Sequence, residues 1–405
     1  MQPSLFALLA VGVFAGVYVG AIPGLSATMA VSLLISFTFS WPTNEALAVM
    51  MGIWVGACYG GSRSAILLNI PGAPAAVATT LDGYPLAQKG EAGQAIGVAT
   101  TQSVVGGFIG VIFMIFLSSP ISKLALSFAS RDYLMLAVMG LLMVGSLGSK
   151  SLEKGLLTAA LGMLFGMIGM DPLSGKVRMT FGATGLMSGV DYVCAMLGLF
   201  GAAEALMQIK TKDIKATKQK VDRIIPKFSS IVKYKWLTLR SSIIGVVIGA
   251  LPGAGGDIAA LVAYSQAKRT VKNPEVPFGE GAVEGVVAPE SANNAAIGGA
   301  LIPMLTMGIP GDAVTAIMIG AMFIHGLRPG PMLLNDTPHL FWFIVGSMVV
   351  ANVFLLIFGL TGIRIFTKIV EVPKRILLPL IIILSVVGIL PQTPWKLEVT
   401  APGIV

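Results

Sequence analysis

Near its N-terminus the chain carries Gly20-Ala21-Ile22-Pro23-Gly24-Leu25-Ser26, which lies inside an uncharged stretch that runs from Met1 to Asn44. A helix crosses the core of a bilayer with about 20 consecutive apolar residues. Proline removes a backbone hydrogen-bond donor and glycine tolerates positive φ, so the Pro23-Gly24 pair should break such a helix. The segment therefore predicts a membrane-embedded helix that stops and restarts.

The rest of the chain has the same apolar character. Of its 405 residues, 55% are hydrophobic and only 11% are charged, whereas charged residues make up about 25% of a soluble domain. Further uncharged stretches cover Ala92–Ser122, Ser241–Gly256, Ser291–Gly311 and Ile376–Trp395. Because one span needs about 20 residues, there is room for on the order of ten spans. The sequence predicts an all-α fold, a polytopic transmembrane helix bundle in a lipid bilayer.

Apolar runs separated by short polar turns indicate where the helices lie. We expect helices at about residues 4–20, 26–40, 46–68, 94–117, 133–148, 155–170 and 187–208, and then at about 241–251, 257–268, 281–307, 312–326, 339–366 and 376–390. Several of these are too short to span a bilayer, and hydropathy does not tell which of them are half-helices.

One segment between the two apolar halves accounts for the net charge of +8. Residues 210–240 contain ten Lys or Arg and two Asp. Positively charged loops beside membrane spans face the cytoplasm and its anionic lipid headgroups. The segment lacks the interleaved aromatic residues of a nucleic-acid interface. We therefore expect a basic cytoplasmic linker at 210–240 and no nucleic-acid partner.

The two halves of the chain share a signature. Gly249-Ala250-Leu251-Pro252-Gly253-Ala254-Gly255 resembles the segment at 20–26, and Gly308-Ile309-Pro310-Gly311-Asp312 resembles Asn69-Ile70-Pro71-Gly72-Ala73. The Pro-Gly pairs are offset by 229 and 239 residues, so their order and approximate spacing are kept. This pattern predicts two structural repeats with broken, re-entrant or half-helices at the Pro-Gly loops. We place the first transmembrane repeat at 1–209, the second at 241–390 and an atypical tail at 391–405.

The Pro-Gly loops also predict where a ligand binds. Unpaired backbone groups cannot face lipid, so the breaks are buried in protein or line a polar cavity. Half-helix N-termini direct free N–H groups and positive dipole ends into that cavity, which suits a carboxylate, and half-helix C-termini suit cations. The alternative is that the breaks are structural kinks and glycine packing contacts. The expected substrate-binding residues are Pro23, Gly24, Leu25, Ser26, Asn69, Pro71, Gly72, Pro252, Gly253, Ala254, Gly255, Asn293, Asn294, Pro310 and Gly311.

Glu290, Asn293 and Asn294 are the expected contacts of a coupling ion. They lie at i, i+3 and i+4 and share one face of a helix. Glu290 opens an otherwise uncharged stretch that ends at Gly311, and an ionisable residue in or at the edge of a membrane is a functional candidate. The alternative is that Glu290, which follows Pro289, is only a carboxylate at the start of a helix.

Two other charged residues receive structural interpretations. We interpret Arg63 as a marker of the membrane boundary rather than a substrate ligand, because arginine side chains snorkel easily. Asp82 lies in Leu81-Asp82-Gly83-Tyr84-Pro85, a strong turn signal. We therefore expect a solvated turn carboxylate there rather than a residue of the cavity mouth.

Several motifs of this chain resemble the large membrane subunit of tripartite tricarboxylate transporters, the TctA family. In the first half they are Gly56-Ala57-Cys58-Tyr59-Gly60-Gly61-Ser62, Asn69-Ile70-Pro71-Gly72-Ala73-Pro74 and Leu81-Asp82-Gly83-Tyr84-Pro85-Leu86-Ala87-Gln88-Lys89-Gly90. In the second half they are Ala288-Pro289-Glu290-Ser291-Ala292-Asn293-Asn294-Ala295, Leu305-Thr306-Met307-Gly308-Ile309-Pro310-Gly311 and Gly326-Leu327-Arg328-Pro329-Gly330-Pro331. The resemblance extends from about residue 12 to about residue 385.

The resemblance implies the permease subunit of a secondary active, ion-gradient-driven importer of small organic carboxylates, tricarboxylates or dicarboxylates. Its expected partners are a small membrane subunit and a periplasmic solute-binding protein that delivers the substrate. The expected location is a multi-pass position in the bacterial inner membrane, with symport of Na⁺ or H⁺ and no other cofactor. Family members continue through further hydrophobic segments, whereas Pro391–Val405 is polar, so the second repeat is expected to be truncated.

Three other functions remain as alternatives. One is another class of secondary anion transporter, and a second is a degenerate or truncated membrane scaffold that does not transport. A third is an intramembrane enzyme, which would need clustered carboxylates, whereas those in this sequence are scattered. The chain has two Cys and two His without metal-site spacing, so we expect no catalytic residues and no metal site.

Overall fold

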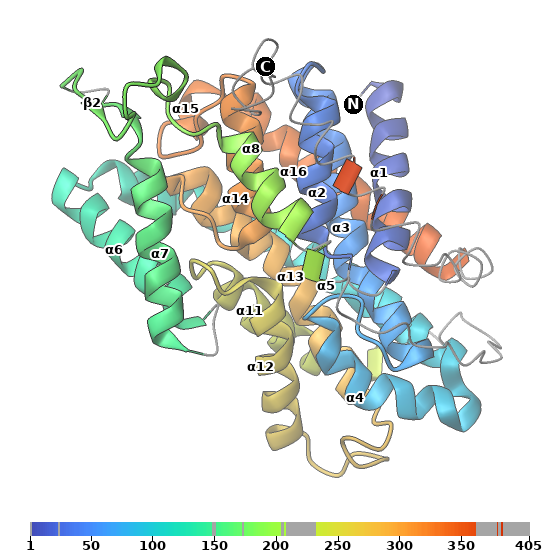
Figure 1. Ribbon diagram of the computed structural model, residues 1–405. Helices are drawn as coiled ribbons and strands as arrows, with labels where there is room; N and C mark the ends of the chain where they lie inside the picture. The colour runs from blue at the N-terminus through green and yellow to red at the C-terminus, as the bar shows by residue number, and fades with distance from the viewer. Residues whose placement is uncertain are drawn as a thin grey trace.

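The computed structural model (Figure 1) describes residues 2–22, 25–147, 151–171, 174–203, 206–207, 232–361, 379 and 382–383. Within this part of the chain nearly all regular structure is helical, and the strands are the short antiparallel pair β1 (Gly169–Met170) and β2 (Val177–Arg178). The predicted all-α fold is confirmed. Pro23, Gly24, residues 210–231 of the predicted linker and the predicted tail at 391–405 lie outside the described residues.

The first half of the chain begins with five helices and a π-helical turn. They are α1 (Pro3–Ala21), α2 (Ala27–Thr38), α3 (Thr43–Leu68), α4 (Ala76–Leu86), η1 (Ala87–Glu91, a π-helix) and α5 (Ala92–Leu126). Then follow α6 (Ser130–Leu147), α7 (Leu152–Gly166), the 3₁₀ turn η2 (Thr184–Leu186), α8 (Tyr192–Met196) and the π-helix η3 (Leu197–Ala202).

The second half also has helices on both sides of each Pro-Gly break. Its elements are α11 (Lys235–Gly249), α12 (Gly255–Thr270), α13 (Glu284–Met307), α14 (Ala313–Ile324), α15 (Leu333–Asp336) and α16 (Pro338–Thr361). α11 begins inside the segment that we predicted as linker, so the predicted start of this helix at about 241 is wrong. Residues 235–240 extend it because Leu237 and Thr238 are buried against the bundle.

The helices are broken at the Pro-Gly loops, as the sequence predicts. α3 ends at Asn69, which has a left-handed backbone conformation (φ 58°), and α13 ends in the same way at Gly308 (φ 71°). α11 and α12 are separated by a turn in which Gly253 has a φ of 78°. Pro71, Pro252 and Pro310 therefore all lie between helices.

Within each half, one pair of helices approaches closely through glycines: α1 with α3 in the first half and α11 with α13 in the second. A Cβ atom added to Gly16 of α1 would lie 2.4 Å from the carbonyl oxygen of Ile53 in α3. A Cβ atom added to Gly245 of α11 would lie 2.2 Å from the carbonyl oxygen of Ala292 in α13. Small residues let helix backbones approach in a membrane, where packing rather than water exclusion drives association. The pairs α1–α3 and α11–α13 are thus assembled in the same way.

The breaks are also packed in the same way in both halves. A Cβ atom on Gly72, in the break after α3, would lie 2.2 Å from the carbonyl oxygen of Gly20. A Cβ atom on Gly311, in the break after α13, would lie 2.4 Å from the carbonyl oxygen of Gly249. Each partner glycine lies three residues before the proline of its own break. The two breaks of each half are therefore in contact with each other.

The short helices that follow the breaks pair across the halves. α2 packs against α14, and α4 packs against α12. In Figure 1 the pair α2 and α14 lies in the upper part of the molecule and the pair α4 and α12 in the lower part. Equivalent half-helices thus extend in opposite directions from the middle of the bundle.

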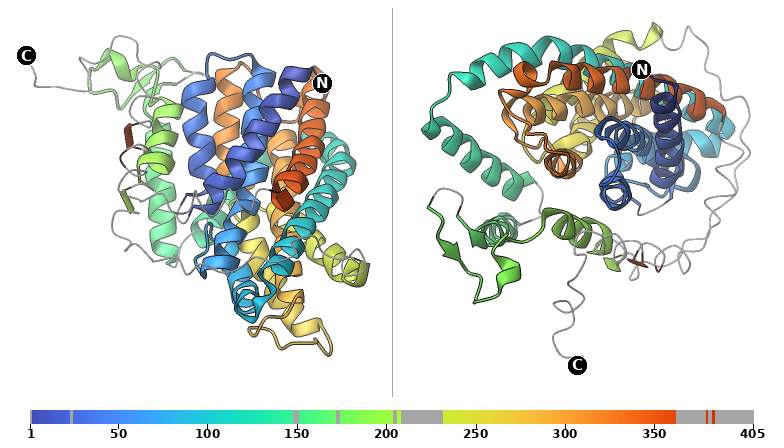
Figure 2. Two further views of the ribbon diagram at one scale, coloured as in Figure 1. Left: turned by 90° about the vertical axis from the view of Figure 1, so that its right-hand side faces the viewer. Right: turned by 90° about the horizontal axis from the view of Figure 1, so that it is seen from above.

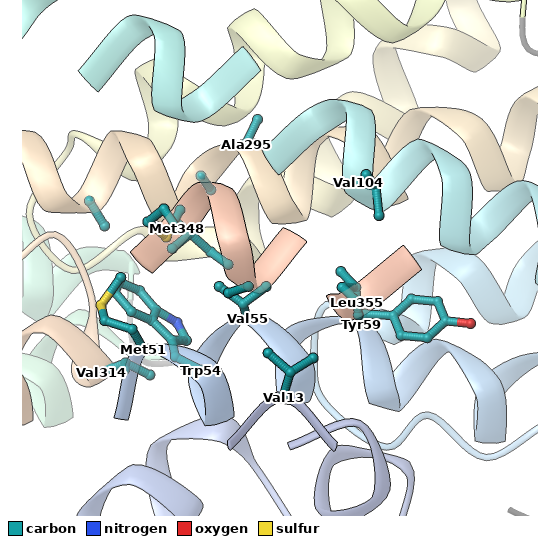
Figure 3. Close-up of a cluster of buried hydrophobic side chains, with 14 of the residues drawn as sticks. Val13, Met51, Trp54, Val55, Tyr59, Val104, Ala295, Val314, Met348 and Leu355 are labelled. Carbon is teal, nitrogen blue, oxygen red and sulfur yellow. The ribbon is translucent and has the colours of Figure 1, made fainter. Parts of the chain in front are cut away.

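The core is built around α3 and α13, which are buried along almost their whole length. α13 is buried from Glu284 to Thr306, and α3 is buried from Ala46 to Leu67 except for Cys58. One hydrophobic cluster joins side chains of both halves, and Figure 3 shows Met51 and Trp54 of the first half near Val314 and Met348 of the second half. A helix that is apolar on all sides belongs in the interior of a bundle. The two halves therefore form one core.

Three helical stretches of the described chain are long and apolar enough to cross a membrane. They are Pro3–Ala21, the combined stretch Ala76–Leu126 and Pro338–Thr361, and two shorter apolar helices are Ala27–Thr38 and Ala313–Ile324. This is fewer than the ten or so spans expected; α3 and α13 are long enough to cross, but charged and polar residues lower their apolar character. Large apolar side chains such as Phe116 (73% exposed) cover the outside, and Figure 2 shows α6 and α7 at the margin of the bundle. The chain is a membrane protein.

The predicted turn at residues 81–85 is wrong. These residues belong to α4, which contains Pro85 and continues into the π-helix η1. Local turn propensity was overridden because this segment packs against α12 and α13. The helical path is kinked only further on, at Gly90, where the backbone has a φ of 87°.

Candidate functional site

Three of the four breaks meet at the centre of the bundle. The N–H of Ala75, at the start of α4, donates to Oδ1 of Asp257 in the first turn of α12, at 3.0 Å. A Cβ atom on Gly255, at the start of α12, would lie 2.8 Å from Cβ of Asp312, the N-cap of α14. The starts of α4, α12 and α14 are thus neighbours, although α4 belongs to the other half of the chain.

The starts of α12 and α14 carry carboxylates, whereas the start of α2 is neutral. Asp312 caps α14 by accepting the Thr315 N–H at 2.7 Å, and Asp257 lies in the first turn of α12. α2 is capped by the neutral Ser26, whose Oγ accepts the Met29 N–H at 3.2 Å. A carboxylate at a helix N-terminus offsets the positive end of the dipole. The two half-helices of the second half therefore favour cations nearby, whereas the start of α2 remains favourable to an anion.

Glu290 lies in a buried cage of hydroxyl groups. It is 1% exposed, and its Oε1 accepts hydrogen bonds from Ser62 Oγ and Thr79 Oγ1, each at 2.5 Å. Its Oε2 accepts from Ser103 Oγ at 2.8 Å. Among the described residues no Lys, Arg or His forms a salt bridge with Glu290. The three hydroxyls come from α3, α4 and α5, so the carboxylate of α13 joins three helices of the first half.

This geometry excludes the interpretation of Glu290 as a helix-start carboxylate. α13 begins at Glu284, so Glu290 lies in its second turn, and its side chain binds other helices. Carboxylate and hydroxyl oxygens are the ligand type that hard cations prefer. A carboxylate whose neighbours are hydroxyls can also take up a proton, because a hydroxyl can accept as well as donate. The cage can therefore accept either a proton or a small cation.

The side chains of Asn293 and Asn294 have different partners, and neither is hydrogen-bonded to the carboxylate of Glu290. Asn293 Nδ2 donates to the carbonyl oxygen of Cys58 at 3.0 Å, and its Oδ1 lies beside Gly256, where a Cβ would be only 2.3 Å away. Asn294 Nδ2 lies 3.5 Å from the carbonyl oxygen of Glu290, and its buried Oδ1 has no hydrogen-bond partner among the described residues. Asn293 thus connects α3, α12 and α13 beside the breaks.

The other predicted substrate contacts have varied surroundings. Pro23 and Gly24 lie outside the described residues, and Leu25 packs in an apolar cluster with Met29. Asn69 is exposed, and Pro71, Gly253 and Pro310 are partly exposed. The buried members of the set are Gly72, Pro252, Ala254, Gly255 and Gly311. The structure brings Gly255 next to Asp312, the residue that follows Gly311. Leu25, in contrast, packs among apolar side chains.

Arg63 is buried inside the protein and does not snorkel to its surface. It is 0% exposed, and its Nη2 donates to the carbonyl oxygens of Phe358 at 2.8 Å and Gly359 at 2.6 Å, near the C-terminal end of α16. Its Nε donates to Tyr59 Oη at 3.3 Å. The interpretation as a snorkelling residue was wrong, because the side chain is buried and its Nη2 donates to helix carbonyls inside the protein. Arg63 connects α3 to α16.

Asp82 is also buried rather than solvated. It is 0% exposed, and its Oδ1 accepts the N–H groups of Gly279, Gly281 and Ala282 at 2.7–2.9 Å. Its Oδ2 accepts a hydrogen bond from Tyr264 Oη at 2.9 Å. The expected turn carboxylate therefore anchors the loop between α12 and α13 to α4.

Sequence reasoning missed the partners of Glu290 and Asp82. Ser62 stands within a family motif, but Thr79 and Ser103 carry no local signal that distinguishes them from other helical hydroxyls. Their role depends on how α3, α4 and α5 are rotated about their axes, and no periodicity in one sequence fixes that rotation. The polar sequence neighbours of Glu290 were visible, whereas its hydrogen-bond donors were not.

These features define a helical membrane protein whose helices are interrupted in both halves around a polar centre. The chain belongs to the family described as "Tripartite tricarboxylate transporter TctA family", which matches residues 6–397. The match confirms the resemblance of the motifs. It also extends to residue 397, into the segment that we predicted to be atypical.

Two relatives come from Agrobacterium vitis. The chain is 38% identical over 381 residues to an "Uncharacterized 52.8 kDa protein in TAR-I ttuC' 3'region", covering 93% of this chain and 75% of that protein. It is 44% identical over 144 residues to an "Uncharacterized protein in TAR-II ttuC' 3'region", covering 36% of this chain and 59% of that protein. No solved structure matches the chain.

Proposed function

We propose that this chain is the permease subunit of an ion-gradient-driven transporter that imports small organic carboxylates. In this proposal it spans the bacterial inner membrane several times and works with a small membrane subunit. A periplasmic solute-binding protein delivers the substrate. The family is a transporter family, and its tripartite character supports two partner proteins.

The contact between the breaks is the observation that carries this proposal. The hydrogen bond from Ala75 to Asp257 joins the break after α3 to the break before α12, across the two halves. Interrupted helices at equivalent places in two halves are the arrangement in which secondary transporters bind substrate and coupling ions. The two halves are the two repeats of the proposal, and the site lies where their breaks meet.

The charges around the breaks support coupling to a cation. A carboxylate substrate that approaches α12 and α14 meets the negative charges of Asp257 and Asp312, which repel it. A cation bound first, at Glu290 or beside Asn293, offsets that repulsion, while the start of α2 offers a positive dipole end. Substrate binding therefore depends on the cation, which is Na⁺ or H⁺.

A matched pair of variants tests the role of Glu290. Glu290→Gln removes the charge and leaves the side chain the same size, whereas Glu280→Gln makes the same change at an exposed loop residue. Both variants are reconstituted in vesicles with the two partner proteins, and citrate uptake is measured under an imposed Na⁺ or H⁺ gradient. We expect Glu290→Gln to abolish gradient-driven uptake while membrane insertion is intact, and Glu280→Gln to transport normally.

The gradients distinguish the two coupling ions. If only a Na⁺ gradient drives uptake in the unaltered protein, the coupling ion is Na⁺, and the reverse result identifies H⁺. Uptake by Glu290→Gln at the rate of the unaltered protein would remove Glu290 from the mechanism. Absence of citrate, tartrate and succinate uptake by the complete unaltered system under either gradient would contradict the proposed function.

A further inference from the structure

The outer ends of α11 and α12 enclose a hollow of about 770 Å³ that the transport proposal does not use. Most of its lining is apolar, and the residues that form it are Trp236, Leu237, Leu239, Arg240, Ile243, Ile244, Gln266, Thr270 and Val271. We call it the α11–α12 groove. Its walls are the first three turns of α11 and the last turns of α12.

The groove contains polar atoms without partners. Nε of Arg240 and Oε1 of Gln266 are both buried, and neither has a hydrogen-bond partner among the described residues. No described carboxylate lies within salt-bridge distance of Arg240. An unpaired buried polar group is costly, and a charged one more so. Arg240 is therefore a cationic donor in the wall of the groove without a described counter-ion, and an anionic group that accepts hydrogen bonds fits it.

The position of the groove matches the headgroup level of a bilayer. Arg240 is the last charged residue before the uncharged stretch Ser241–Gly256, and one turn earlier Trp236 is 73% exposed, with Lys235 Nζ 5.8 Å from its ring. Tryptophan and lysine mark the membrane interface. The last turn of α12 adds Lys268 and Arg269, both exposed. Charged side chains thus surround the mouth of an apolar groove.

We propose that the α11–α12 groove binds one anionic phospholipid. Its phosphate accepts hydrogen bonds from Arg240, and an acyl chain lies along Leu239, Ile243 and Ile244. Arginine forms strong, directed hydrogen bonds with phosphate. A zwitterionic lipid fits the apolar part equally well, but it lacks the net charge that the surrounding basic residues favour.

The bound lipid braces the helices on both sides of the break at Pro252. α11 leads into this break and α12 leads out of it, so a molecule that fills the space between their outer ends opposes their separation. The groove therefore links the lipid composition of the membrane to the rigidity of one half of the bundle.

Fluorescence quenching by brominated lipids tests the proposal. The intact chain is placed in phosphatidylcholine vesicles that contain a minor fraction of brominated phosphatidylglycerol or, in parallel, brominated phosphatidylcholine. The contribution of Trp236 is the difference between the unaltered protein and Trp236→Phe. One favourable charge near the membrane surface corresponds to roughly fivefold enrichment of an anionic lipid. We expect stronger quenching of Trp236 by phosphatidylglycerol, consistent with enrichment of that order.

Three variants distinguish lipid binding in the groove from a general attraction of anionic lipids to the surrounding basic residues. Arg240→Gln should make quenching by the two lipids equal, and Arg240→Lys should retain part of the preference for phosphatidylglycerol. Arg269→Gln makes the same charge change outside the groove and should retain most of it. Equal quenching by both lipids in the unaltered protein, or an effect of Arg269→Gln as large as that of Arg240→Gln, would overturn the proposal. Absence of quenching by either lipid would show that another protein segment fills the groove, and would also overturn it.

Discussion

Asp82 binds a loop that lies 197–200 residues further along the chain. Its carboxylate accepts three backbone N–H groups from the segment before α13, and Tyr264 of α12 donates the fourth hydrogen bond. Hydrogen bonds to a charged acceptor are stronger than those to a neutral one. A single side chain of α4 therefore fixes how the second half enters its central helix.

We predict that Asp82→Ala is much more destabilising than Tyr264→Phe. The first change leaves three N–H groups without an acceptor, and the two of buried residues, Gly281 and Ala282, cost about 1–3 kcal/mol each, whereas the second removes one hydrogen bond worth about 1 kcal/mol. Thermal unfolding of the purified protein in detergent measures the difference. Limited trypsin digestion gives a local measurement, because Lys272 is exposed in the loop and should be cleaved faster when Asp82 is absent. Equal unfolding temperatures and equal cleavage would contradict the anchoring role.

The sequence identified Glu290 as a candidate, but it did not identify the environment of Glu290. An isolated charge at the edge of an uncharged stretch is visible in one sequence. The partner Ser62 is 228 residues away, so its contact depends on packing between helices. Asp82 and Arg63 were misinterpreted for the same reason, since both have partners that are remote in sequence.

At the scale of helices, the breaks could be predicted because their cause is local. Proline and glycine impose their backbone restrictions wherever they stand, and α3, α11 and α13 all end at the predicted places. α4 could not be predicted, because its sequence contains Asp-Gly and Tyr-Pro turn signals. It is helical because its buried face packs on α12 and α13, and a local pattern does not contain that information.

We predict that glycines in the α1–α3 contact and in the α11–α13 contact are equally intolerant of a methyl group. A Cβ atom on Gly56 of α3 would lie 2.4 Å from the carbonyl oxygen of Val13, and one on Gly245 of α11 would lie 2.2 Å from that of Ala292. Because the obstacle is backbone, the helices must separate, and overpacking of this kind costs about 1–3 kcal/mol. Gly56→Ala and Gly245→Ala should therefore both lower the unfolding temperature.

Gly162 of α7 is the matched control for these substitutions. It is also inside a helix, but an added Cβ would meet nothing within 4 Å. Gly162→Ala should be neutral or stabilising by about 0.5–1 kcal/mol, because alanine favours the helix. If Gly245→Ala unfolds at the same temperature as Gly162→Ala, the close contact between α11 and α13 is not required.

At the scale of the whole molecule, the two halves are interlocked rather than placed side by side. α2 contacts α14 and α4 contacts α12, so each half supplies one short helix to each side of the bundle. The order of the Pro-Gly signatures predicted two similar halves, but not this exchange of partners. The division into repeats at residues 1–209 and 241–390 stays a prediction, since 210–231 lies outside the described residues.

The proposal that the breaks of both halves surround one carboxylate site is tested most directly by substrate protection of two equivalent cysteines. Ile70→Cys and Ile309→Cys, each partly exposed beside its Pro-Gly pair, are introduced singly into a chain that carries Cys58→Ala and Cys194→Ala. Arg131→Cys, at a side chain that is 87% exposed, is the control. Labelling by a small maleimide is followed with and without citrate, in preparations that transport citrate.

We expect citrate, together with the coupling cation, to slow labelling at both Ile70→Cys and Ile309→Cys and to leave Arg131→Cys unchanged. Protection at both positions requires that the breaks of the two halves surround the same ligand. Labelling that citrate does not slow at either position, or slows at only one of them, would contradict a site shared by the two halves.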